Sequence, residues 1–241
     1  MSSKSNQWLF SQNDMAKTPT ILDGMPWENE RILRAKGGNF IINAGMTLKL
    51  PPTTIYTAGI YFQRFYMRHS FRTYHHYDLA GTCLFLASKE EETGRRLRDV
   101  VTISVRKARK DDAYKVDENS DDFRRWKETI LYHEELVLET LCFDLNLELP
   151  YSFLFEILAR CAATPKQALS AIAFTNDFIK TPLCLMYPPQ VLAGVSVFLS
   201  SQVMQETLFE VKSGKAWWEI STADTELIQD AVETLYVSVM P

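Results

Sequence analysis

The hydrophobic pattern of the chain is organised around two matching segments. Residues 79–88 (LAGTCLFLAS) return 113 positions later as residues 192–201 (LAGVSVFLSS). In both segments apolar and small residues follow one another with few polar interruptions, which is typical of a helix covered by neighbours on most sides. The same offset aligns Phe40 with Phe153, Pro52 with Pro165, Ala58 with Ala171, Tyr61 with Phe174 and Phe65 with Phe178. The pattern therefore indicates two copies of one helical unit.

Each copy carries a glycine at the same place, Gly81 in the first and Gly194 in the second. A glycine inside a helix costs about 0.8–1 kcal/mol relative to alanine. Because both copies accept this cost, we expect another helix to approach the backbone closely at each glycine. Each unit should therefore contain a central, buried helix.

Helical periodicity and proline positions predict the other elements. Pro26 and Glu28 open a helix that runs to about Leu48, and Pro51 and Pro52 close it and begin the next one. Further helices are predicted over residues 77–91, 96–109, 124–141, 151–163, 165–181, 188–206 and 223–238. No alternating strand pattern competes with them.

These elements predict an all-α protein built from two tandem five-helix bundles. Residues 1–25 form an amino-terminal extension, residues 26–148 the first bundle and residues 149–241 the second. The extension is expected to pack on the first bundle.

Charge is unevenly distributed along the chain. The net charge is −4, and residues 110–122 alone carry six acidic and two basic side chains. This segment has no helical period and is predicted to be an exposed loop. The end of each unit matches again as VLETL at 137–141 and AVETL at 231–235, where the offset falls from 113 to 94 and leaves 19 extra residues in the first copy. The acidic loop accounts for most of them.

The composition is that of a globular protein, with 46% hydrophobic and 23% charged residues. No apolar stretch approaches the roughly 20 residues that cross a bilayer, and the polar start has no secretory pattern. We therefore expect a soluble intracellular protein with no membrane partner. The cysteines occur singly in apolar segments and are expected to be buried and free of disulfides: Cys83, Cys142, Cys161 and Cys184.

Several longer stretches together resemble the cyclin box. They are FIINAG at 40–45, YFQRFYM at 61–67, AGTCLFLASKEEE at 80–92 and EELVLETLCFDL at 134–145. More narrowly, KTPT at 17–20, RFYMRHSF at 64–71 and KAWWE at 215–219 resemble the transcriptional cyclins of the K and T type. The match covers nearly the whole chain and implies the tandem five-helix fold that the repeat already indicates.

The resemblance implies that Lys89 and Glu134 contact a kinase, because the paired Lys and Glu of the family fall at these positions. Lys can donate to backbone carbonyls of a partner, and Glu can accept from its amides. In the second copy the matching residues are Gln202 and Ile228, so only the first unit carries the pair. The resemblance adds the kinase-binding positions Glu92, Leu138, Phe143 and Leu145. From residue type alone, each charge could equally be a solvated surface group and each apolar residue part of the core.

By resemblance, the chain is a non-catalytic regulatory subunit that binds and activates a cyclin-dependent kinase of the transcriptional group. The kinase's regulatory helix would move inward on binding, because the cyclin favours that state. The substrate implied is the carboxy-terminal domain of RNA polymerase II during transcription elongation, in the nucleus, with additional cytoplasmic presence left open. The sequence leaves open whether a third subunit joins, and it calls for no cofactor, no metal and no direct DNA contact.

Two departures from the family pattern are visible. Glu90 follows the motif lysine, where many cyclins have an apolar residue. Residues 33–37 (LRAKG) replace the apolar patch with which cell-cycle cyclins capture substrates, so that docking site is expected to be absent. Arg34 remains from that patch, but the acidic partner is replaced by Gln63, so a salt bridge between these positions is not expected.

Basic residues crowd the segment from 95 to 110. On a helix, four arginines fall on one face with Thr102 and could receive phosphate groups or an acidic partner: Arg95, Arg98, Arg106 and Arg109. We call these four residues the basic stripe. The alternative is a solvated face balanced by the neighbouring acidic loop.

Other functional classes find little support. The chain has no phosphate-binding glycine loop, no nucleophile elbow and no Cys-x-x-Cys pair. A nucleic-acid-binding core of the TFIIB type, which also uses tandem bundles, needs a strongly basic field, whereas this chain has a pI near 5.7. Loss of Lys89 and Glu134 would have favoured a scaffold that uses the fold without activating a kinase, but both residues are present. The aromatic pair at 217–218 is expected to be a buried plug.

Overall fold

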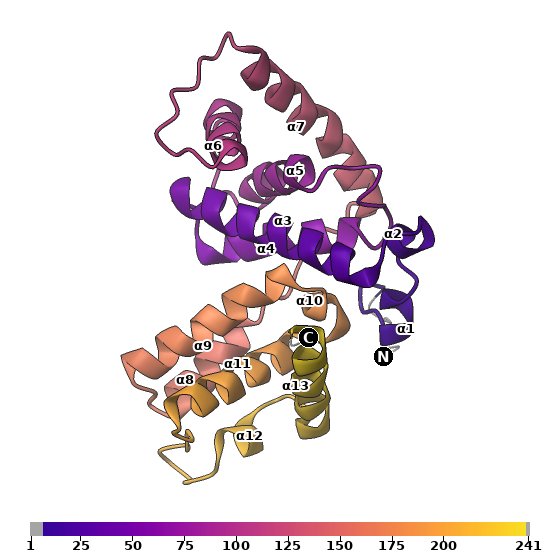
Figure 1. The fold of residues 1–241 in the computed structure, drawn as a ribbon. Helices are drawn as coiled ribbons and strands as arrows, with labels where there is room; N and C mark the ends of the chain where they lie inside the picture. The colour runs from indigo at the N-terminus through magenta and orange to yellow at the C-terminus, as the bar shows by residue number, and fades with distance from the viewer. Residues whose placement is uncertain (1–6, 240–241) are drawn as a thin grey trace. The chain divides into compact units, whose positions relative to one another are not determined.

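The structure is a computed structural model that describes residues 7–239 (Figure 1). Within these residues the secondary structure is helical apart from an isolated bridge between Phe209 and Ala216, which confirms the all-α prediction. Among the described residues, no helix combines the length and the apolar composition that crossing a membrane requires.

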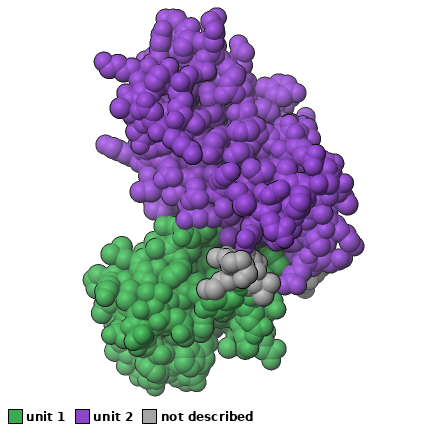
Figure 2. Space-filling view, in the orientation of Figure 1, with its two compact units in different colours: residues 1–9, 148–178, 183–241 green, residues 10–147, 179–182 purple. Residues whose placement is uncertain are grey.

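The chain divides into two compact units, shown in different colours in Figure 2. Residues 10–147 and 179–182 form one of them, which we call the N-terminal unit (unit 2 in Figure 2). The rest of the described chain forms the C-terminal unit (unit 1 in Figure 2). The domain limits predicted from the repeat stay a prediction.

Seven α-helices lie in the N-terminal unit, and the five long ones match the predicted elements. They are α1 Gln12–Met15, α2 Pro19–Leu22, α3 Trp27–Thr47, α4 Pro52–Phe65, α5 His76–Glu90, α6 Leu97–Arg109 and α7 Asp121–Thr140. The two short helices α1 and α2 are single turns, too brief to show a hydrophobic period.

The C-terminal unit repeats this organisation in shortened form. Its α-helices are α8 Tyr151–Arg160, α9 Pro165–Asp177, α10 Leu183–Met186, α11 Pro189–Met204, α12 Trp217–Ile220 and α13 Thr225–Val239. A 3-10 turn, Phe178–Lys180, follows α9, and its last two residues are assigned to the N-terminal unit. Of the tryptophan pair, Trp217 is buried as predicted, whereas Trp218 is 41% exposed.

Local sequence explains where the helices begin. The hydroxyls of Thr18, Ser120 and Thr164 accept hydrogen bonds from backbone amides in the first turns of α2, α7 and α9. A proline occupies the first turn of α2, α4, α9 and α11, where its missing N–H leaves no helical bond unmade. These signals explain why the predicted starts agree closely with the structure.

The two repeated segments form the central helices, α5 and α11. Every residue from 79 to 88 in α5 is buried, and α5 packs against α3, α4, α6 and α7. A Cβ atom at Gly81 would lie 3.1 Å from Ser104 Oγ and 3.2 Å from Trp126, and one at Gly194 would lie 2.6 Å from the Ile228 side chain. The expected close approach at both glycines is therefore confirmed.

Candidate docking site

Lys89 and Glu134 lie on two packed helices and form an ion pair. Lys89 is the penultimate residue of α5, and its ammonium contacts Glu134 Oε1 on α7. The ammonium also lies 4.7 Å from the centre of the Phe85 ring, where the π face attracts a cation. The Lys89 side chain is 47% exposed, and that of Glu134 is 15% exposed.

The pair combines a shielded anion with an accessible cation. Glu134 Oε1 is screened from solvent, and among residues 7–239 the Lys89 ammonium is the group that contacts it. About half of the Lys89 side chain stays exposed to groups outside the chain, whereas the Glu134 side chain is mostly covered.

The other predicted kinase-binding residues follow this pair along the backbone. The Glu92 amide donates to Lys89 O at 3.2 Å, and the Phe143 amide donates to Leu138 O at 3.0 Å. Leu138 lies one helical turn after Glu134 and is partly exposed. Phe143 is 67% exposed, which is the opposite of a core position. Leu145 is partly exposed, and Glu92 is exposed.

A strained turn carries Phe143. After α7 ends, Cys142 and Phe143 both adopt the left-handed conformation, with φ of 54° and 56°. Their amides donate to Glu139 O at 2.9 Å and to Leu138 O at 3.0 Å, the bond pattern of a Schellman motif. A non-glycine residue in this region costs about 1–2 kcal/mol.

The prediction that Cys142 is buried is wrong, because the helix ends before it and leaves it in the exposed turn.

Replacing Cys142 with glycine is expected to raise the free energy of unfolding by about 0.5–1 kcal/mol. Glycine has no Cβ to strain at positive φ, and this gain exceeds the backbone entropy that glycine loses on folding. Urea denaturation measures the change, and Cys142→Ala is the control, since it removes the sulfur but keeps the Cβ and should give no gain. A glycine variant no more stable than the alanine variant would contradict the strain.

Side chains of α4 hold the same turn in place, and sequence reasoning missed them. The Tyr61 hydroxyl donates to Leu145 O at 2.9 Å, and Arg64 donates to Asp144 O at 3.2 Å. Burial, with a further contribution from the Glu90 and Glu91 carboxylates, raises the pKa of Tyr61, so its hydroxyl keeps the proton it donates. The repeat contained one signal, because Tyr61 aligns with Phe174, which has no hydroxyl.

The turn after α5 is also fixed from neighbouring elements. Thr57 donates to Glu91 Oε1 at 2.8 Å, and Thr54 lies 3.3 Å from Thr93 between their hydroxyl oxygens. Arg95 donates to Leu48 O at 2.9 Å and to Lys49 O at 2.8 Å, which satisfies carbonyls at the end of α3. Arg95 is therefore an α3 cap in this structure.

The other three arginines of the basic stripe contact the acidic loop. Arg98 pairs with Glu118 at 3.2 Å, Arg106 donates to Tyr114 O at 2.9 Å, and Arg109 pairs with Asp122. The hydrogen bond from Arg109 lowers the pKa of the Asp122 carboxyl. Residues 110–120 lie outside the helices and contact α6 through Glu118 and Tyr114, whereas Asp121 and Asp122, which were predicted to belong to the loop, begin α7. Binding of an external acidic partner by the stripe stays a prediction.

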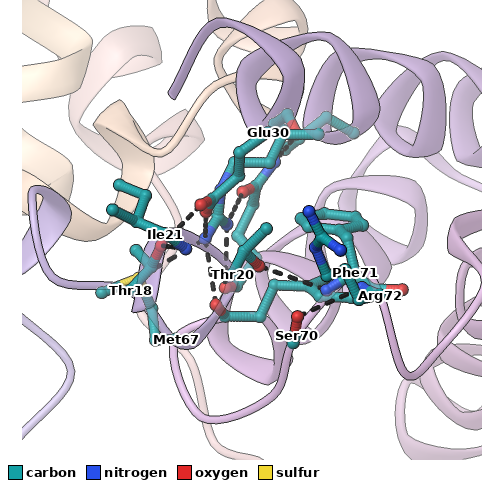
Figure 3. Close-up of polar contacts among 12 residues, drawn as sticks. Thr18, Thr20, Ile21, Glu30, Met67, Ser70, Phe71 and Arg72 are labelled. Atoms are coloured by element: carbon teal, nitrogen blue, oxygen red, sulfur yellow. Dashed lines mark hydrogen bonds and ion pairs between the residues drawn. The ribbon is translucent and has the colours of Figure 1, made fainter. Parts of the chain in front are cut away.

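A buried polar network joins α3 to α4. Arg34 pairs with Glu30 at 2.7 Å, and both side chains are fully buried. Arg34 also donates to Gln63 Oε1 at 2.7 Å and to Tyr66 O at 3.1 Å, and Thr18 donates to Glu30 Oε2 at 2.5 Å. Figure 3 shows Glu30, Thr18 and Met67 converging around this network. Gln63 is thus a hydrogen-bond partner of Arg34, and the ionic partner is Glu30, four residues before it.

The two aligned positions of the C-terminal unit do not repeat the Lys89–Glu134 pair. Gln202, which aligns with Lys89, is exposed near the end of α11. Ile228, which aligns with Glu134, is buried on α13 against Gly194. Across the described part of the chain, no three His, Cys, Asp or Glu side chains gather as metal ligands would.

Comparison with known proteins places this geometry in a family. The family model described as "Cyclin, N-terminal domain" matches residues 3–146. The crystal structure of the yeast RNA Pol II CTD kinase CTDK-1 complex contains a chain of the same fold, with a TM-score of 0.75 and 20% identity over 96% of this chain and 73% of that chain.

One relative extends the match to the full length of the chain, and a second covers most of it. Cyclin pch1 of Schizosaccharomyces pombe is 37% identical over 245 residues, covering 100% of this chain and 72% of that protein. Cyclin-K of Homo sapiens is 31% identical over 232 residues, covering 92% of this chain but only 39% of that protein. The chain therefore belongs to the cyclin family, and its resemblance to cyclins of the K and T type is confirmed.

Proposed function

We propose that this cyclin is the regulatory subunit of a transcriptional cyclin-dependent kinase, which it binds through the N-terminal unit and activates. The observation that carries the proposal is the Lys89–Glu134 ion pair, with its half-exposed lysine, in the same unit as the exposed Phe143; the aligned positions of the C-terminal unit hold Gln202 and Ile228 instead. If these residues only built the bundle, the second bundle would need them too.

The geometry supports a simple division of roles. Lys89 donates to backbone carbonyls of the kinase, and Glu134 accepts from its backbone amides. Docking therefore leaves none of these polar groups buried without a hydrogen-bond partner. Leu138, Phe143 and Leu145 pack against the apolar face of the kinase's regulatory helix. Glu92, which is exposed in the turn after α5, contributes to the same docking surface.

Activation follows from binding one kinase state better than the other. The cyclin binds more tightly to the kinase state in which the regulatory helix lies inward. Binding therefore raises the population of that kinase state. In that state the kinase's own lysine and glutamate pair and its activation loop is released. The cyclin supplies binding energy and no reacting group.

The relatives support the transcriptional assignment. One solved complex of the same fold is an RNA Pol II CTD kinase, which favours the carboxy-terminal domain of RNA polymerase II as substrate and the nucleus as the place of action. Because the chain spans 39% of Cyclin-K, the partners and substrates of such longer proteins extend to this chain only as part of the proposal.

The test is kinase capture by the double variant Lys89→Ala with Glu134→Ala. We expect about a tenfold or greater loss of affinity for the kinase co-purified from the native cell, since losing interface anchors costs more than about 1 kcal/mol each. Phosphorylation of a polymerase carboxy-terminal repeat peptide should fall in parallel, with unchanged circular dichroism.

Gln202→Ala supplies the matched control, because it removes an exposed side chain at the aligned position of the other unit. It should bind the kinase as the wild type does. Capture of the kinase by the double variant at wild-type strength would refute the proposed docking surface.

A further inference from the structure

The segment that presents Phe143 has an unusual backbone. We call residues 142–145 the docking turn. It contains two consecutive non-glycine residues in the left-handed region, Cys142 and Phe143. Such conformations persist only where surrounding structure holds them, and they concentrate at binding sites. The two Schellman bonds hold the beginning of the turn, so its end needs separate support.

That support comes from two buried donors on one helix. Tyr61 and Arg64 are three residues apart on α4, so they share a face. Tyr61 is fully buried and Arg64 is nearly so. Their donors reach successive carbonyls of the docking turn, Leu145 O from the hydroxyl at 2.9 Å and Asp144 O from the guanidinium at 3.2 Å. The backbone after Phe143 is therefore tied to a rigid helix at two adjacent points.

The repeat shows that bundle architecture alone does not require these donors. At the offset of 113 residues, Tyr61 aligns with Phe174 and Arg64 with Asp177. Neither aligned side chain can donate as its counterpart does: phenylalanine has no polar group, and an ionised aspartate only accepts. The two donors thus occur in the same copy as Lys89 and Glu134.

We propose that Tyr61 and Arg64 are positioning residues for kinase docking, which act by holding the docking turn in its binding conformation and touch no kinase atom themselves. This inference rests on the proposed function. A turn already held in the binding conformation loses little freedom on docking, whereas an untethered turn binds only through the fraction that is correctly arranged. Loss of a tether therefore weakens binding without removing any contact residue.

Tyr61→Phe tests the proposal by deleting one hydroxyl and keeping the ring. We expect about a fivefold to tenfold rise in Kd for the kinase, seen mainly as slower association, because the untethered turn of the free protein is correctly arranged only part of the time. Amide hydrogen exchange should speed up selectively in residues 142–147. Incorporation of 4-aminophenylalanine at position 61 restores a donor on the same ring and should recover most of the affinity.

Tyr66→Phe is the matched control. Its hydroxyl also donates to a backbone carbonyl, Tyr74 O at 3.0 Å, but this bond holds a different loop of the same unit. Both variants lose one tyrosine–carbonyl bond, so a purely structural effect would weaken kinase binding equally. The proposal predicts that Tyr66→Phe binds within twofold of the wild type.

The outcomes separate this inference from the function it rests on. Wild-type affinity for Tyr61→Phe, or an equal loss in Tyr66→Phe, would overturn the positioning role while leaving the Lys89 and Glu134 surface intact. Normal capture by the Lys89 and Glu134 double variant would instead overturn the docking surface.

Discussion

Replacing Arg34 with methionine is expected to lower the free energy of unfolding by about 3–5 kcal/mol, because it leaves the Glu30 carboxylate buried without its cation. Arg34 and Glu30 pair at 2.7 Å with both side chains fully buried. Arg34 also donates to Gln63 Oε1 and to Tyr66 O, so the substitution strands two acceptors besides the carboxylate. Urea denaturation of the whole chain measures the effect.

The double variant Glu30→Met with Arg34→Met is the control for this prediction. Replacing a buried ion pair by apolar residues of similar volume is often nearly neutral, whereas breaking it is not. The double variant should therefore be more stable than Arg34→Met alone. Glu30→Met alone completes the comparison. If the stability loss of the double variant equals the sum of the losses of the two single variants, the pair is not coupled as its burial and its 2.7 Å separation imply.

The second large effect is expected for Gly38→Ala, a loss of about 2–3 kcal/mol. A Cβ atom at position 38 on α3 would lie 2.8 Å from Ile179 O and 2.9 Å from Lys180 Cα, which belong to the same compact unit. Both atoms are backbone and cannot move aside as a side-chain end can. Overpacking of this kind costs about 1–3 kcal/mol, and here the upper part of that range outweighs the better helix propensity of alanine.

Gly94→Ala provides the comparison for Gly38→Ala. A Cβ atom at position 94 would meet nothing within 4 Å, and Gly94 is not held at positive φ. Its substitution should change the free energy of unfolding by less than about 0.5 kcal/mol. Thermal or urea unfolding of both variants decides the matter, and equal stability of the two would show that α3 does not need glycine for close packing.

The difference between the two repeated units links these results to function. The ion pair of Lys89 and Glu134 occurs in one unit only, and so do the Tyr61 and Arg64 contacts to the docking turn. In the other unit, Ile228 fills the space beside Gly194 and packs as core. The fold is thus shared by both copies, while the groups suited to docking are confined to one.

Much of the fold could be predicted because its signals are local. Prolines and hydroxyl caps mark helix starts, and the repeated glycines mark close packing, so α3, α5 and α11 agree with expectation within a few residues. The single-turn helices α1, α2, α10 and α12 could not be predicted, because four residues contain too little of a helical period.

For the candidate site, residue type and resemblance predicted the members but not their contacts. The basic stripe illustrates the limit: helical spacing grouped Arg95 with Arg106, yet the first caps α3 and the second holds the acidic loop. Similarly, the sequence predicted no salt bridge between Arg34 and Gln63 but did not identify Glu30 as the ionic partner of Arg34. Which partner an arginine takes depends on what is buried beside it. The prediction that Cys142 is buried was wrong for a related reason. Because α7 ends at Thr140, Cys142 lies in the exposed turn after the helix and not in the core.

The sequence by itself determined that the protein is all-α, that it carries two copies of one unit, and that only the first copy has Lys and Glu at the aligned positions 89 and 134. Those facts depend on periodicity and spacing, which are properties of neighbours along the chain. Only the tertiary structure decided that the two charges meet across α5 and α7 and that Tyr61 reaches Leu145, 84 residues further along. Contacts at such separations depend on how helices pack, and the physical reason is that packing assigns each polar group its partner.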